Sequence, residues 1–284
     1  MNFALEISGL VKYYHSGIRG VLVEALSGVD MSVKQGEVFG LLGPNGAGKS
    51  TTIKIILGLL KPNAGSCKIF GSTLSTAVKR RIGYLPESPN FYKFLSAREL
   101  VVFYARVCGL GKKEASERAE EALEMVGLKD AMDRRLGEYS KGMLQRAGLA
   151  GAIVHNPDFV ILDEPSSGLD PVGMSDMCDM ILELKRRGKT VLLSSHLLSE
   201  VESVCDSVAI LNRGRVAACG ALSELLNAPD TSELEFKNLS AEATEKISEL
   251  AASEGAKLVG VRPAKIPLKK YFESVVSRGG EKDE

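Results

Sequence analysis

The chain has 284 residues, of which 36 are Lys or Arg and 36 are Asp or Glu, so its formal net charge is zero. This balance lacks the basic surplus of nucleic-acid-binding proteins, and we expect no nucleic acid among its partners. Hydrophobic residues make up 44%, which is enough for a buried core, and the length fits one large domain or a domain with an appendage.

The cysteines and apolar runs favour a reduced, cytosolic protein. The cysteine number is odd and no pair has metal-ligand spacing, so we expect small buried hydrophobes at Cys67, Cys108, Cys178, Cys205 and Cys219. The N-terminus lacks the pattern of a signal peptide. Apolar runs such as residues 55–60 are shorter than the roughly 20 residues that span a bilayer, so a role at a membrane would require another chain.

The first part of the chain predicts strands and one helix. Residues 3–10 and 21–33 are strand-like with glycine-containing turns. Residues 37–42 predict a short apolar strand that ends in a glycine-rich loop, and residues 51–60 predict the following helix. Residues 82–85 predict another buried strand.

The middle of the chain is predicted to be helical. Residues 96–126 favour helix, and Ser96 with Glu99 three positions later forms a candidate capping box. Residues 112–124 alternate charged and apolar positions at helical spacing, which indicates a solvated amphipathic helix rather than a binding surface. Residues 140–154 predict a further helix.

Strands and helices alternate again after residue 158, which predicts an α/β fold with a mainly parallel sheet. Pro171 is suited to the first turn of a helix that runs to Arg187. The expected strands are residues 159–162, 190–194, 208–211 and 215–218, the last two as a hairpin.

The composition changes after about residue 228. We expect a nucleotide-binding domain over residues 1–228, with a helical part at about 88–156, and a small accessory domain over 229–284. Its predicted parts are a linker (229–232), strands (233–236 and 257–261), helices (241–253 and 268–276) and a disordered tail (279–284).

A phosphate-binding loop is the strongest motif. Residues 43–51 fit G-x-x-x-x-G-K-[ST] between a predicted strand and a predicted helix. Glycines let backbone N–H groups point at one phosphate, and the helix dipole adds positive potential. Lys49 would neutralise the β- and γ-phosphates of ATP, and Ser50 would offer its hydroxyl to Mg²⁺. A glycine-rich turn without function is the alternative. The candidate ATP-binding residues are Gly43, Pro44, Asn45, Gly46, Ala47, Gly48, Lys49, Ser50 and Thr51.

Two carboxylates follow the predicted strand 159–162. Ligands bind at the carboxyl ends of strands in an open parallel sheet, which is where Asp163 and Glu164 would lie. Asp163 is a candidate Mg²⁺ ligand, and Glu164 is a candidate general base for an attacking water. An Asp-Glu pair after a strand is also a common helix cap, but the upstream phosphate loop favours catalysis.

Together these motifs resemble the ABC transporter ATPases. The resemblance implies a P-loop NTPase core with a mainly parallel sheet, an N-terminal antiparallel β subdomain, a helical signature subdomain and a small C-terminal α+β appendage. The family signature Leu-Ser-Gly-Gly-Gln corresponds to residues 139–143, where Ser140 and Gly142 match. Tyr139, Lys141 and Met143 depart from it, as in the bacterial ABC-2 type branch. The resemblance implies that this loop contacts ATP held by the opposite subunit; a plain N-capped helix is the alternative.

Further positions take roles from the resemblance. Residues 167–170 are similar to the D-loop that lines the dimer seam, and His196 matches the switch histidine that contacts the γ-phosphate. Tyr14 matches the aromatic residue that stacks on adenine, although the neighbouring Tyr13 leaves packing in the sheet open. Glu87 replaces the family's glutamine and would offer an oxygen to Mg²⁺ or water.

The resemblance implies an assembly as well as a reaction. Two copies would enclose two ATP molecules and drive a separate transmembrane permease, with export as the expected direction, from the cytoplasmic face of the inner membrane. Residues 89–94 could seat a permease helix or pack internally. The alternatives are a soluble ABC ATPase that acts on ribosomes or DNA, and a metabolite kinase, which would leave Ser140, Asp170 and His196 without a role.

Overall fold

The computed structural model describes residues 2–16, 21–226 and 240–256. The chain divides into two compact units, residues 1–226 and 227–284. In the second unit, α9 (Ala241–Ser253) forms where a helix was expected, and Ser240 caps it by accepting a hydrogen bond from the N–H of Ala243. The other elements and the tail expected after residue 228 lie outside the described residues, so the accessory domain stays a prediction.

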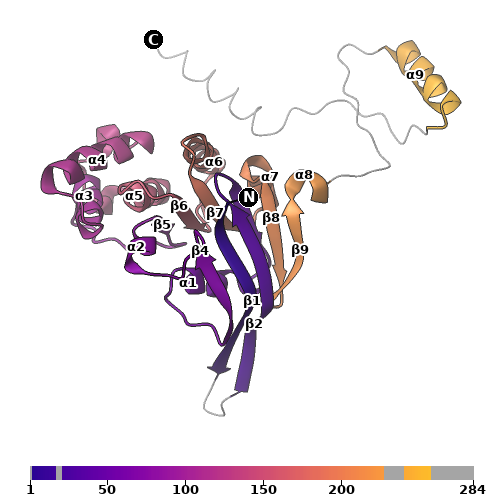
Figure 1. Cartoon of the computed structure of the whole chain (residues 1–284). Helices are drawn as coiled ribbons and strands as arrows, with labels where there is room; N and C mark the ends of the chain where they lie inside the picture. The colour runs from indigo at the N-terminus through magenta and orange to yellow at the C-terminus, as the bar shows by residue number, and fades with distance from the viewer. Residues whose placement is uncertain (1, 17–20, 227–239, 257–284) are drawn as a thin grey trace, which may run out of the picture. The chain divides into compact units, whose positions relative to one another are not determined.

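The N-terminal part of the first unit is an antiparallel sheet, as expected (Figure 1). Its strand order is β2-β1-β4, with β1 (Phe3–Ser16), β2 (Val21–Lys34) and β4 (Ala64–Ile69). The sequence did not predict β4, because most of its residues are exposed and it shows no apolar alternation.

The main sheet has six strands in the order β5-β6-β7-β3-β8-β9. All neighbours are parallel except the hairpin of β8 and β9, which is antiparallel as expected. Every residue of the central β3, β6 and β7 is buried, because both faces of the sheet are covered. The strands are β3 (Val38–Leu42), β5 (Ile82–Leu85), β6 (Phe159–Asp163), β7 (Thr190–Ser195), β8 (Ser207–Asn212) and β9 (Arg215–Ala221).

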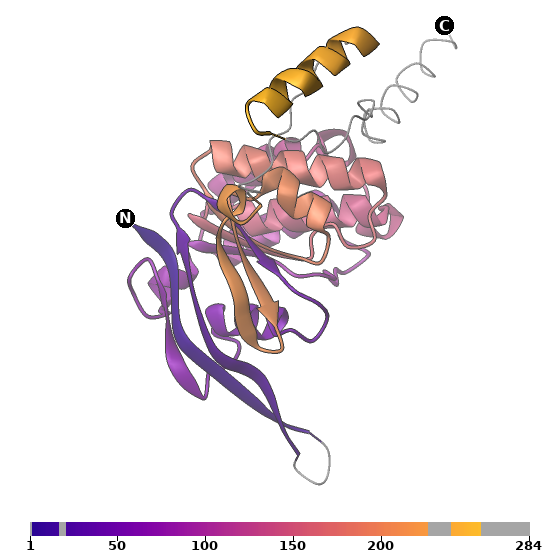
Figure 2. The same ribbon diagram turned by 90° about the vertical axis from the view of Figure 1, so that its right-hand side faces the viewer.

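Helices follow the strands that carry the candidate site. These are α1 (Lys49–Ile56) after β3, α6 (Pro171–Arg186) after β6 and α7 (Leu198–Val204) after β7. Figure 2 shows the same arrangement from a second direction. The short helices α2 (Thr76–Lys79) and α8 (Leu222–Leu225), like α7, were not predicted.

Three helices form the region between β5 and β6: α3 (Ala97–Val107), α4 (Lys112–Met125) and α5 (Lys141–Ile153). The helical character predicted for residues 96–126 is confirmed as two helices, α4 covering the predicted amphipathic helix 112–124, and the break between them falls where Gly109 adopts a φ of 98° and Gly111 precedes α4 in extended conformation. The capping box of Ser96 and Glu99 is confirmed.

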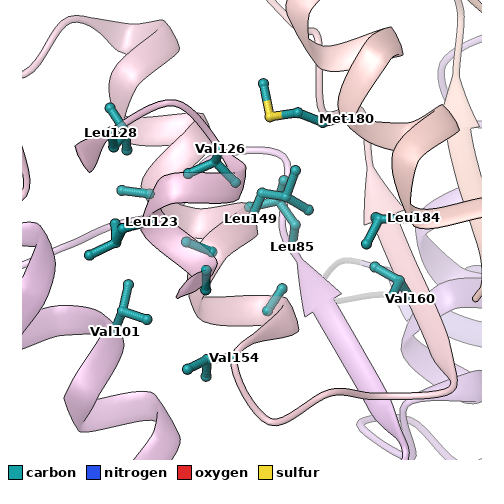
Figure 3. Close-up of a cluster of buried hydrophobic side chains, with 14 of the residues drawn as sticks. Leu85, Val101, Leu123, Val126, Leu128, Leu149, Val154, Val160, Met180 and Leu184 are labelled. Carbon is teal, nitrogen blue, oxygen red and sulfur yellow. The ribbon is translucent and has the colours of Figure 1, made fainter. Parts of the chain in front are cut away.

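A buried cluster joins these helices to the sheet (Figure 3). Leu123 of α4, Leu149 of α5 and Val160 of β6 belong to it and are fully buried. Through this cluster α5, which Ser140 caps, shares one core with β6.

Two expectations about the chain's chemistry can be compared with the structure. All five cysteines are free; Cys219 is exposed, so the expectation of burial is wrong there, and the other four are half-buried rather than buried. Among the described residues, the structure contains no helix with the length and apolar character needed to cross a bilayer.

Candidate nucleotide-binding and catalytic site

The phosphate loop connects β3 to α1. Gly46 and Gly48 have φ values of 81° and 109°, which glycine adopts far more readily than other residues. The N–H of Ala47 donates to Pro44 O at 3.1 Å, and the N–H of Gly214 donates to Ala47 O at 3.0 Å, so the β8–β9 turn supports the loop. No side chain caps α1 at Gly48, and first-turn N–H groups lack acceptors within a helix. They can therefore bind a phosphate.

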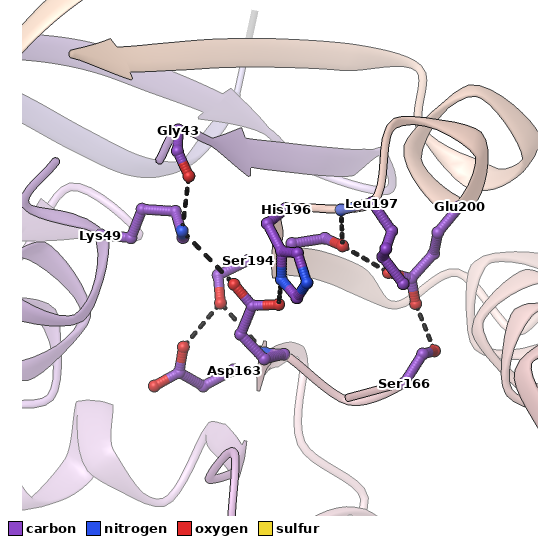
Figure 4. A network of polar contacts seen from close by, with 10 residues as sticks. Gly43, Lys49, Asp163, Ser166, Ser194, His196, Leu197 and Glu200 are labelled. Carbon is purple, nitrogen blue, oxygen red and sulfur yellow. Dashed lines mark hydrogen bonds and ion pairs between the residues drawn. The ribbon is translucent and has the colours of Figure 1, made fainter. Parts of the chain in front are cut away.

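Lys49 lies inside the loop, with 6% of its surface exposed. Its Nζ donates to Gly43 O at 2.7 Å and lies 3.3 Å from Oε1 of Glu164 (Figure 4). The lysine thus links the phosphate loop to the end of β6.

Glu164 and His196 meet between β6 and β7. Oε2 of Glu164 lies 2.6 Å from Nδ1 of His196. Glu164 adopts a φ of 49°, unusual for a residue other than glycine, and its N–H contacts both the carbonyl and the hydroxyl oxygen of Ser194 at 3.1 Å. This strained backbone directs the carboxylate towards Lys49 and His196.

Asp163 is placed by strand register. It pairs with Ser194 across β6 and β7, and the Ser194 hydroxyl donates to Asp163 Oδ1 at 2.6 Å. Burial raises the pKa of Asp163, and the negative charges of Glu164 and Glu87 raise it further. A bound cation would relieve this repulsion, so the donor set fits Mg²⁺. Among the described residues, no group of three or more His, Cys, Asp or Glu could hold a metal ion, so Mg²⁺ would also need phosphate oxygens and the exposed Ser50.

Tyr14 and Glu87 lie at the edges of this cluster. The hydroxyl oxygen of Tyr14 is 3.4 Å from Thr51 Oγ1, and 37% of the tyrosine is exposed. Glu87 is exposed, and its backbone carbonyl accepts a hydrogen bond of 2.9 Å from Nε2 of the buried Gln145 on α5.

The signature residues form a different site. Ser140 caps α5 by accepting a hydrogen bond from the N–H of Met143 at 3.3 Å. Ser140 and Gly142 line a pocket of about 410 Å³ with residues of the segment 168–176. Tyr139, which departs from the family signature, is buried, and its hydroxyl donates to Ala131 O at 2.8 Å. This departure therefore serves packing.

Four polar residues that the sequence did not single out belong to the site or support it. These are Gln145, Ser166, Ser194 and Glu200, and all four are buried. Gln145 bonds the carbonyl of Glu87, Ser194 accepts from the N–H of Glu164, and Glu200 accepts from Ser166 and from Ser195, which precedes His196. Their only sequence signal was a polar residue at a strand end or on an apolar helix face, which also describes ordinary caps.

A phosphate loop after β3, carboxylates after β6 and a histidine after the intervening β7 define a P-loop nucleoside triphosphatase. The comparisons with known proteins extend this class. Residues 26–167 match the family model described as ABC transporter.

Two curated relatives align over most of the chain. An ABC transporter ATP-binding protein of Nostoc sp., all4389, is 43% identical over 235 residues, which cover 81% of this chain and 70% of the relative. The daunorubicin/doxorubicin resistance ATP-binding protein DrrA of Streptomyces peucetius is 37% identical over 254 residues, covering 88% of this chain and 75% of DrrA.

The solved structures agree with this assignment. The dimeric structure of MJ0796, a bacterial ABC transporter cassette, matches with a TM-score of 0.70 and 27% identity, covering 77% of this chain and 98% of that one. The chain belongs to the ABC transporter family. It is an ATP-binding subunit of that family, and its reaction is ATP hydrolysis.

Proposed function

We propose that two copies of this chain enclose two ATP molecules and that hydrolysis drives a separate transmembrane permease at the cytoplasmic face of the inner membrane. The observation that carries the proposal is the convergence of Lys49, Glu164 and His196 from the segments that follow β3, β6 and β7 of one sheet. This arrangement places a cation for the phosphate tail next to a carboxylate and an imidazole that can position and deprotonate a water molecule.

Each residue of the site has its own role in the proposed binding and hydrolysis of ATP. The loop 43–51 and Lys49 bind the phosphates, and Tyr14 stacks on the adenine. Glu164 accepts the proton of the attacking water, and His196 holds Glu164 and the γ-phosphate in register. Ser50, Asp163 and Glu87 would hold Mg²⁺, which supplies charge neutralisation at the β- and γ-phosphates.

Dimerisation is supported by the presence of two separate groups of candidate ATP-contacting residues in one copy, the Lys49 cluster and the pocket at Ser140. Ser140 and Gly142 line a pocket with the D-loop residues Gly168, Leu169 and Asp170, which the Lys49 cluster does not include. A second copy could bring this pocket to the ATP held by the first. The dimeric MJ0796 cassette supports such an arrangement.

The loop before α3, residues 89–94, is the proposed permease seat. Tyr92 and Phe94 are 71% and 68% exposed and lie with their ring centroids 5.6 Å apart, whereas Phe91 packs against the core. Phe91 thus packs internally, and the exposure of Tyr92 and Phe94 supports the proposed seat. Export as the direction is supported by the drug-resistance name of DrrA. An ATPase that acts on ribosomes or DNA remains the second hypothesis, and purification from membrane extracts tests it by identifying the partner chain.

The variant Glu164→Gln tests the central assignment. We expect hydrolysis to fall by about a hundredfold or more, because the general base is lost, while ATP still binds. With ATP and Mg²⁺ the variant should elute from gel filtration as a dimer. The control is Glu202→Gln, the same change at an exposed residue of α7. Parental hydrolysis by Glu164→Gln would contradict the proposal.

A further inference from the structure

Glu200 of α7 is a buried carboxylate outside the residues that bind or hydrolyse ATP. Only 3% of it is exposed, and among the described residues no lysine or arginine forms an ion pair with it. Its Oε1 accepts a hydrogen bond from the Ser166 hydroxyl, and its Oε2 accepts one of 2.6 Å from the Ser195 hydroxyl. Burial raises its pKa. Charge without a cation is costly in such a place, so an apolar residue would suit the fold better.

The two serines flank the catalytic pair. Ser166 lies two positions after Glu164, and Ser195 directly precedes His196. Both hydroxyls are almost fully buried, at 1% exposure. Since Glu164 and His196 are themselves in contact at 2.6 Å, the two loops are joined once through the catalytic side chains and again through Glu200 (Figure 4).

Ser195 also shapes the turn that carries His196. Its hydroxyl oxygen accepts a hydrogen bond of 3.0 Å from the N–H of Leu197 while its hydroxyl hydrogen goes to Glu200. The backbone on both sides of His196 therefore depends on one hydroxyl, and the orientation of that hydroxyl depends on the carboxylate. The helix α7 has no side-chain cap of its own at Leu197 that could replace this support.

We propose that Glu200 is a positioning residue for hydrolysis, which clamps the loop after β6 to the turn after β7 so that Glu164 and His196 stay in contact. This inference rests on the proposed roles of Glu164 and His196. The clamp requires an acceptor for two hydroxyl hydrogens at once. A glutamine side chain has an acceptor oxygen on one arm and a donor NH2 group on the other, so it cannot accept both hydroxyl hydrogens as the two carboxylate oxygens do.

The test compares four full-length proteins in a steady-state ATPase assay: the parent, Glu200→Gln, His196→Ala and the double variant. We expect Glu200→Gln to lower kcat about tenfold and to leave KM for ATP within about twofold, because no contact to ATP is removed. In the His196→Ala background the same change should lower kcat by less than about twofold, because its target is gone. Glu202→Gln, on the same helix, should match the parent.

The outcomes separate the two proposals. If His196→Ala hydrolyses ATP at the parental rate, the proposed function fails. If His196→Ala is impaired but Glu200→Gln is not, or if the two effects multiply in the double variant, only the role of Glu200 fails; multiplying effects would indicate a general role in the fold. Should Glu200→Gln not fold, Ser166→Ala removes one arm of the clamp and is held to the same criteria.

Discussion

Gly48 is a residue of the phosphate loop at which both the backbone conformation and the surrounding atoms disfavour a side chain. Its φ of 109° disfavours any other residue, and a Cβ there would lie 2.6 Å from Leu26 Cδ2 and 2.9 Å from the carbonyl oxygen of Ala25. Gly46 has a φ of 81°, but a Cβ there would meet no heavy atom within 4 Å. Comparing the two glycines therefore separates the effect of backbone strain, which applies to both, from the effect of steric overlap, which applies to Gly48 and not to Gly46.

We expect Gly48→Ala to lower the free energy of unfolding more than Gly46→Ala does. Strain at positive φ costs about 1–3 kcal/mol at either position. Overlap with a backbone carbonyl, which cannot rotate away as a side chain can, adds about 1–3 kcal/mol at Gly48 alone. Urea unfolding without nucleotide measures both values and avoids interference from a phosphate. Equal destabilisation by the two variants would refute the reasoning.

Two further predictions concern the buried carboxylate and the exposed aromatics. Burial raises the pKa of Glu200 above its ordinary value of 4.5, so the folded chain holds this proton more tightly than the unfolded chain. The parent should therefore lose stability as pH rises from 4.5 through the folded pKa. Urea unfolding across this range should show Glu200→Gln gaining stability relative to the parent, whereas Glu202→Gln should show no such trend; parallel curves for all three would contradict the pKa. Tyr92→Ala and Phe94→Ala should reduce recovery of the permease from membrane extracts without changing the unfolding midpoint, whereas Phe91→Ala should lower that midpoint; an unchanged recovery would remove the proposed seat.

The residues of the catalytic cluster were predictable because their chemistry is local. Residues 43–51 contain both the glycines and the lysine of one loop, and Asp163 and Glu164 end one apolar strand. Each of these two signals occupies a short stretch whose neighbours set its context. His196 lies 32 residues after Glu164 and was assigned only through the resemblance to the ABC family.

The supporting residues were not predictable, because their partners lie far away in the sequence. Ser194 bonds Asp163 only because β6 and β7 align in one register, and Glu200 bonds Ser166 across the same pair of loops. Neither residue type is unusual at its position. By contrast, α4 begins where the charged helical pattern of residues 112–124 predicted a helix, and Gly109 and Gly111 separate it from α3.

The pairing of Asp163 with Ser194 has a consequence for how this chain can vary. Successive side chains of a strand point to opposite faces, so inserting or deleting one residue within β6 or β7 would turn one of these groups away from the nucleotide. The distances needed for hydrolysis are therefore held by aliphatic residues that never touch ATP, such as Leu162 and Leu193, which are neighbours in the same ladder. Insertions should therefore be excluded from these two strands and from the loops after them that carry Glu164 and His196.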